Sequence, residues 1–149
     1  MRRIAPMFFR FADFRLRLRP DRGAQPVAAI GVWECDLATE RLRWSDGVYD
    51  LFGLPRGSVL DRATAVRLYD RQSRIEMECL RTTAIRDRTG FSIDALIHPA
   101  RGVERWIRIT AQVECVAGQA VRLFGAKHDV TQEHLLWAAR GLHPTFAHH

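Results

Sequence analysis

The chain has 149 residues, of which 47% are hydrophobic and 27% are charged, and its formal net charge is +6. This length allows one domain with a buried core but not two, and the composition is that of an ordinary soluble globular protein. No apolar run approaches the roughly 18 residues of a membrane span. The three cysteines, Cys35, Cys79 and Cys115, form no CxxC pair, which argues against a disulfide or zinc scaffold and predicts a cytoplasmic location.

The positive charge is concentrated near the N-terminus. Residues 1–22 contain seven arginines and two aspartates, whereas basic and acidic residues are nearly balanced in the rest of the chain. Apolar residues recur there at helical spacing, which predicts a basic amphipathic helix and a turn over residues 1–23. The arginines are expected to face solvent, and contact with nucleic acid or an anionic membrane stays open as an alternative.

Alternation of apolar and polar residues predicts strands in two parts of the chain. In the first part, a strand at 31–37 turns into a short strand at 41–44. In the second part, strands are predicted at 91–97, 105–116 and 121–128, and the last two form a hairpin around Gly118.

Helices are predicted between and after these strands. Ser45 is placed to cap a short helix that ends at Gly53, and Thr131 is placed to cap another over residues 132–140. A longer helix is expected between a capping box at Ser73 and Glu76 and a stop at Gly90. Its inward side chains are predicted to be Ile75, Cys79, Leu80 and Ala84.

This order of elements predicts an α+β fold, in which a five-stranded antiparallel sheet carries short helices on one face. An N-terminal amphipathic helix and a short C-terminal helix flank it. Two stretches also carry family motifs: Gly31-Val32-Trp33-Glu34, Trp44-Ser45 and Phe52-Gly53-Leu54 in the first, and Arg105-Trp106 and Asp129-Val130-Thr131 in the second. They resemble a PAS domain of bacterial sensory and signalling proteins, over residues 28–135. Residues 136–149 are then the end of the outgoing helix and a disordered tail.

The resemblance implies roles for particular residues. In PAS domains the closing Asp-Ile-Thr motif ties the last strand to the outgoing helix, so Asp129 and Thr131 are expected to relay a signal. The space between sheet and helices is expected to be a ligand pocket or a solid core. By alternation its walls are Trp33, Cys35, Leu37, Phe52, Cys79, Ile93, Ile107, Ile109, Leu123 and Gly125.

Contact between subunits or with a partner is expected at two apolar surfaces, the N-terminal helix and the outer face of the sheet. The residues expected to form these surfaces are Phe8, Phe11, Phe14, Trp106 and Phe124.

The sequence shows no catalytic or metal-binding motif. Photoreceptors of the PAS family carry a flavin-reactive cysteine before the long helix, and residues 58–75 contain none. Haem-binding relatives commonly use a histidine of that helix, and residues 71–90 contain none. The missing cysteine argues against a covalent flavin adduct, and the missing histidine argues against haem bound by the long helix.

We therefore expect a non-enzymatic sensory or regulatory module that acts through homodimerisation and a signalling partner, with or without a small ligand in its pocket. One alternative is a sensor that holds flavin or another planar cofactor non-covalently, and a second is a nucleic-acid-binding module that uses the arginine-rich arm. A fragment of a histidine kinase or a diguanylate cyclase would have the same features.

Overall fold

The computed structural model describes residues 30–141, so the predicted N-terminal helix, with Phe8, Phe11 and Phe14, lies outside the described residues. In chain order the elements are β1 (Ile30–Asp36), β2 (Leu42–Trp44), α2 (Asp46–Phe52), α3 (Arg62–Arg67), α4 (Arg71–Asp87), β3 (Phe91–Ile97), β4 (Arg105–Val116), β5 (Gln119–Asp129) and α5 (Thr131–Ala139).

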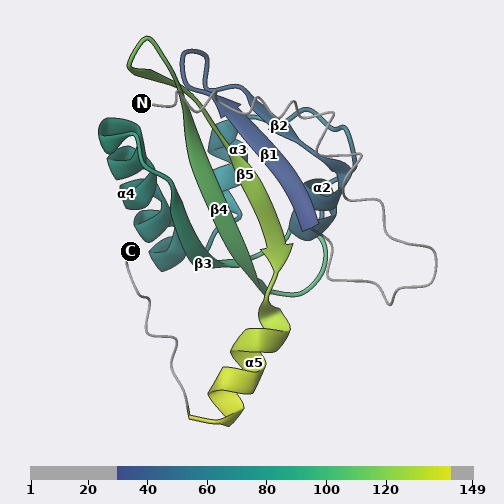
Figure 1. The fold of residues 1–149 in the computed structure, drawn as a ribbon. Coiled ribbons are helices and arrows are strands. Elements are labelled where there is room, and N and C mark those ends of the chain that lie inside the picture. The colour runs from purple at the N-terminus through teal and green to yellow at the C-terminus, as the bar shows by residue number, and fades with distance from the viewer. Residues whose placement is uncertain (1–29, 142–149) are drawn as a thin grey trace, which may run out of the picture.

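The five strands form one antiparallel sheet in the order β2-β1-β5-β4-β3. The helices α2, α3 and α4 lie against one face of this sheet, and α5 leaves from the end of β5 (Figure 1). Phe52 of α2 and Ile107 of β4 have no exposed surface in the core between them. The predicted α+β fold is confirmed. Among the described helices, none has the length and apolar character needed to cross a membrane.

The predicted hairpin is formed by β4 and β5. Ala117 and Gly118 connect the two strands, both with positive φ (49° and 79°), as in the tight turns that match strand twist. The register shifts between Glu114 and Cys115, close to this turn. Because the shift interrupts the inward alternation, Cys115 is exposed.

The two strands approach each other closely at Gly125. A Cβ atom at this position would lie only 1.8 Å from the carbonyl oxygen of Thr110. Gly125 also pairs with Trp33 on β1. The glycine therefore permits the close approach and leaves the inner face beside Trp33 free of another side chain.

The predicted limits of α4 are displaced. The helix begins at Arg71, and its N-cap is Asp70, whose carboxylate accepts a hydrogen bond from the backbone of Gln72. Ser73 lies inside the helix, and its hydroxyl accepts a hydrogen bond from the backbone of Leu96 at 2.9 Å. A serine that binds a neighbouring strand is not available to cap its own helix, so the predicted capping box is wrong.

The buried face of α4 also differs from the prediction. Met77 and Ala84 are buried, whereas Ile75 is 52% exposed and Cys79 is exposed. Two residues along a helix correspond to a rotation of about 200°, so Ile75 and Cys79 lie on the side opposite Met77. The helix ends at Asp87, before the predicted stop.

Ser45 precedes α2 as predicted, and Gly53 ends that helix with a left-handed φ of 63°. The Ser45 hydroxyl does not cap the helix. It accepts a hydrogen bond from the backbone of Val32 at 2.9 Å and so ties the start of α2 to β1.

Candidate functional site

An inner cavity of about 50 Å³ lies between the sheet and the helices α3 and α4. Most of its walls are apolar, and its charged side chains within the described residues come from α3, α4 and β5. The lining residues are Trp33, Cys35, Leu42, Trp44, Arg62, Ala65, Val66, Tyr69, Met77, Arg81, Phe91, Ile109, Leu123 and Lys127.

Lys127 is the central polar residue of this cavity. It lies on β5 and is 7% exposed, although lysine is among the residues least often buried. Its Nζ donates a hydrogen bond to the Tyr69 hydroxyl at 3.1 Å. Four aromatic rings surround the same nitrogen, with centroids 5.1–5.7 Å away: Trp33, Trp44, Phe52 and Tyr69.

This environment destabilises the charged form of Lys127 relative to the neutral form. Burial lowers the pKa of Lys127 from 10.5 to about 7, and the positive charge of Arg62 acts in the same direction. The aromatic faces attract the ammonium, but they do not replace its lost hydration. Burial also raises the pKa of the Tyr69 hydroxyl, so Tyr69 stays protonated and keeps a hydrogen to donate.

Two arginines lie beside Lys127 in the cavity wall, and both have carboxylate partners outside the lining. Arg62 of α3 pairs with Glu78 and Glu40, and Arg81 of α4 donates to Glu40 at 3.0 and 3.1 Å. Within residues 30–141, no carboxylate lies within 4.0 Å of Lys127 Nζ. Lys127 is therefore a buried cation without an ion-pair partner in the described part of the chain.

Two further donors in this wall lack an acceptor. The indole nitrogens of Trp33 and Trp44 are buried, and neither makes a hydrogen bond within the described residues. A buried donor left without an acceptor costs about 1–3 kcal/mol, and such groups are rare in folded proteins. Among residues 30–141, those that line the cavity thus carry one cation without an ion-pair partner and two N–H groups without an acceptor.

A flavin does not fit the cavity in this structure. Sites for ligands of that size have volumes of roughly 300–1,000 Å³. The cavity has about 50 Å³, and the Lys127 ammonium occupies the space between the aromatic rings that a planar cofactor would need. We therefore derive no function through flavin.

The structure brings together only part of the predicted pocket. Trp33, Cys35, Ile109 and Leu123 line the inner cavity. Phe52, Ile93 and Ile107 are buried in the core without lining it, and Leu37 packs at the edge of that core. Gly125 lines a groove on the other face of the sheet, and Cys79 lies exposed on α4.

The sequence contained a signal for Lys127 that the prediction did not use. The inward alternation of Leu123 and Gly125 continues to position 127, which places the lysine on the inner face. Arg62, Tyr69 and Arg81 gave no comparable signal, because they come from helices or a helix end whose orientation no strand pattern determines.

The predicted relay residues lie two and four positions after Lys127, where β5 becomes α5. The Asp129 carboxylate accepts a hydrogen bond from the backbone of Thr131 at 2.8 Å. The Thr131 hydroxyl accepts one from the backbone of Trp106 at 3.0 Å, at the start of β4. Thr131 therefore joins α5 to the sheet, and the prediction that its side chain caps the helix is wrong, since the N-cap position is Val130.

A cluster of charged and aromatic side chains, called here the α5 cluster, holds α5 against the sheet. The His134 ring lies parallel to that of Trp106, with centroids 4.1 Å apart, and its Nε2 donates to Asp94 at 2.8 Å. Arg108 donates to both oxygens of Asp94 and to Glu133. Burial acts to raise the pKa of Asp94, but the hydrogen bonds from Arg108 and His134 outweigh it and hold that pKa below its ordinary value.

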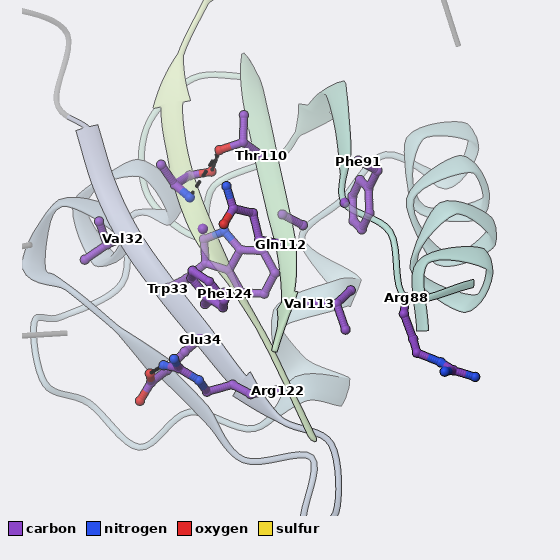
Figure 2. A pocket seen from close by; sticks show the side chains of 14 residues that line it. Val32, Trp33, Glu34, Arg88, Phe91, Thr110, Gln112, Val113, Arg122 and Phe124 are labelled. Carbon is purple, nitrogen blue, oxygen red and sulfur yellow. Dashed lines mark hydrogen bonds and ion pairs between the residues drawn. The ribbon is translucent and has the colours of Figure 1, made fainter. Parts of the chain in front are cut away.

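An outer groove of about 730 Å³ lies on the sheet face opposite the inner cavity. Figure 2 shows its side chains, among them Val32, Gln112 and Phe124, and the ion pair between Glu34 and Arg122. Phe124 belongs to the predicted contact surface and does line this groove. Trp106, which was assigned to the same surface, has one ring face against His134 of α5 instead.

Comparison with solved structures shows which fold this is. An RNA-binding light-oxygen-voltage receptor superposes with a TM-score of 0.63 at 17% identity, over 76% of this chain and 35% of that chain. The N-terminal domain of a diguanylate cyclase with PAS/PAC sensor from Marinobacter aquaeolei gives 0.64 at 18% identity, over 70% of this chain and 98% of that chain. A sensory box histidine kinase/response regulator from Burkholderia thailandensis superposes with a TM-score of 0.63 at 20% identity, over 76% of this chain and 89% of that chain.

These matches show that the chain has the PAS fold, as the sequence motifs predicted. The receptor named first is much longer than its matched part, since this chain spans about a third of it. No protein-family model and no curated protein matches the sequence.

Proposed function

We propose that this PAS-fold chain is a non-enzymatic sensory module, in which the state of the inner cavity controls how α5 is held against the sheet. The observation that carries this proposal is the arrangement along β5. Lys127 faces the cavity, Asp129 receives a hydrogen bond from the first residue of α5, and only one residue separates the two. A displacement of β5 at Lys127 therefore acts directly on the start of α5.

The solved structures of similar fold support a role in signalling. Two of them come from a diguanylate cyclase with PAS/PAC sensor and from a sensory box histidine kinase/response regulator. We propose that this chain passes its signal on by forming a homodimer and by docking a signalling partner. The apolar part of the outer groove, which includes Phe124, supplies a contact surface for this purpose.

The proposal requires that a change at Lys127 alters α5. The test compares the wild type with Lys127→Met by hydrogen–deuterium exchange, following the backbone amides of residues 131–140. Arg67→Met serves as the matched control, because Arg67 is an exposed basic residue of α3 that does not line the cavity. We expect altered exchange of α5 in Lys127→Met alone. Equal exchange in all three proteins would contradict the proposal.

The arginine-rich arm lies outside the described residues, so binding of nucleic acid or an anionic membrane by residues 1–22 stays a prediction from the sequence.

A further inference from the structure

The chemistry of the inner cavity indicates the class of ligand that it binds. Among residues 30–141, the charged side chains in its wall are all cationic, namely Lys127, Arg62 and Arg81, and none is an aspartate or a glutamate. The other polar groups are the Tyr69 hydroxyl, the Cys35 thiol and the two indole N–H groups. The wall is therefore rich in hydrogen-bond donors and poor in acceptors.

These donors are not all satisfied by the protein itself. Arg62 and Arg81 have Glu40 and Glu78 as partners. Lys127 has only the neutral Tyr69 oxygen and the aromatic faces, and the Trp33 and Trp44 N–H groups have no partner within residues 30–141. Buried donors of this kind are expected to have a hydrogen-bond acceptor. An anion is such an acceptor, and its charge strengthens the hydrogen bonds that it accepts.

We propose that the inner cavity binds a short organic monocarboxylate, whose carboxylate group pairs with the Lys127 ammonium and accepts hydrogen bonds from the Trp33 and Trp44 indoles. This inference names the ligand class of the sensory site proposed above and rests on that proposal. A neutral ligand would leave the lysine charge unpaired, and a cation would be repelled by all three basic residues.

The size and the walls of the cavity limit the ligand further. Its volume of about 50 Å³ is several times the roughly 10–15 Å³ that one water molecule needs in a protein cavity. A carboxylate group with one or two further carbons fits this space. Leu42, Ala65 and Met77 provide apolar contacts for the alkyl part. Propionate is therefore the probe of matching size.

Binding should also depend on pH. A carboxylate favours the charged lysine, and only the ammonium form offers it a full positive charge. The other groups that face Lys127 are Arg62, Arg81, Tyr69 and Cys35. Burial raises the pKa of both Tyr69 and the Cys35 thiol, which keeps these two neutral. Affinity for propionate should therefore fall as the pH rises above 7.

The four tryptophans allow a direct test. Sodium propionate is titrated into the ¹⁵N-labelled protein at pH 6, and the indole N–H signals are followed by NMR. Trp33 and Trp44 line the cavity, whereas Trp106 and Trp137 lie in the α5 cluster around His134. We expect the first pair to shift with saturation. Sodium chloride at equal ionic strength and propionamide should produce no saturable shift.

Two variants complete the test. Lys127→Met should lower the affinity for propionate at least 10-fold, and Trp44→Phe, which keeps a ring but removes the N–H, should lower it about 10-fold. Arg67→Met should bind as the wild type does. Failure of propionate to shift the two indoles would overturn the inference, as would unchanged binding by Lys127→Met.

Failure of this inference can be told apart from failure of the proposed function. If propionate does not bind but Lys127→Met still alters the exchange of α5, the ligand class is wrong and the sensory proposal stands. If propionate binds and neither it nor the Lys127→Met substitution changes α5, the ligand class stands and the sensory proposal is wrong.

Discussion

Replacing Lys127 with methionine should stabilise the protein, and the gain should depend on pH. The pKa of Lys127 is 10.5 in its ordinary state and about 7 in the fold. Between these two values the unfolded chain holds a proton that the folded chain has lost, so the stability of the wild type rises with pH across this window. Below pH 7 both states are charged, and the full cost of burying the ammonium is present. Above pH 10.5 both states are neutral, and the cost is absent.

The magnitude follows from the same two values. At 1.36 kcal/mol for each pKa unit, a pKa lowered from 10.5 to about 7 corresponds to about 5 kcal/mol. Methionine has a similar length and no charge, so it avoids this cost. It also loses the hydrogen bond to Tyr69, which is worth about 1 kcal/mol. The free energy of unfolding of Lys127→Met should therefore exceed that of the wild type by about 4 kcal/mol at pH 6. This difference should vanish by about pH 10.

The assay is urea unfolding followed by tryptophan fluorescence at pH 6, 7, 8, 9 and 10, in chloride buffers that contain no carboxylate. Arg67→Met is measured in parallel, and its difference from the wild type should stay small at every pH. Two results would refute the reasoning: a constant difference between Lys127→Met and the wild type across the series, or a less stable variant at pH 6. Either would mean that the ammonium is not buried at a cost in the folded protein.

Three further substitutions test other parts of the structure. Asp94→Asn removes the carboxylate that His134 and Arg108 share, so the backbone amides of α5 should exchange about 10-fold faster while those of β4 stay protected. An equal change in α5 and β4 would argue against local release of α5. Phe124→Asp should weaken self-association in sedimentation, with Val59→Asp, on a fully exposed loop residue, as the control; equal masses for the two variants would count against the outer-groove contact. Gly125→Ala forces a methyl group against a carbonyl oxygen 1.8 Å away and should cost up to about 3 kcal/mol in thermal unfolding, so a wild-type Tm would show that β4 and β5 separate easily there.

The sheet could be predicted from the sequence because its signal is local and simple. Alternation with period two located the strands, and Gly118 located the turn of the hairpin. The buried face of α4 could not be predicted in the same way. Ile75 and Met77 are both apolar, and only the packing against the sheet decides which one is inward. Ser73 matched a capping pattern for a similar reason, since its partner on β3 is distant in sequence.

The candidate site was harder to predict than the fold, because its chemistry depends on residues that contradict the apolar pattern. An expectation of apolar pocket walls selects Leu123 and Ile109 and passes over Lys127, although the same alternation places the lysine inward. Trp106 was read as an exposed contact residue because its strand position faces outward. The structure shows that α5 covers it through His134, a contact between residues 28 positions apart.

The energetic position of Lys127 supports the view that the cavity is a site and not simply core. Domains of this size are stable by about 5–15 kcal/mol, so a cost of about 5 kcal/mol at one residue is a large share of the total. A fold selected only for stability would gain by placing an apolar side chain among Trp33, Trp44, Phe52 and Tyr69. A ligand that supplies the missing negative charge recovers part of this cost, and by linkage the recovered free energy stabilises the liganded arrangement of β5. Since β5 continues into Asp129 and α5, that free energy is available where the proposed signal leaves the domain.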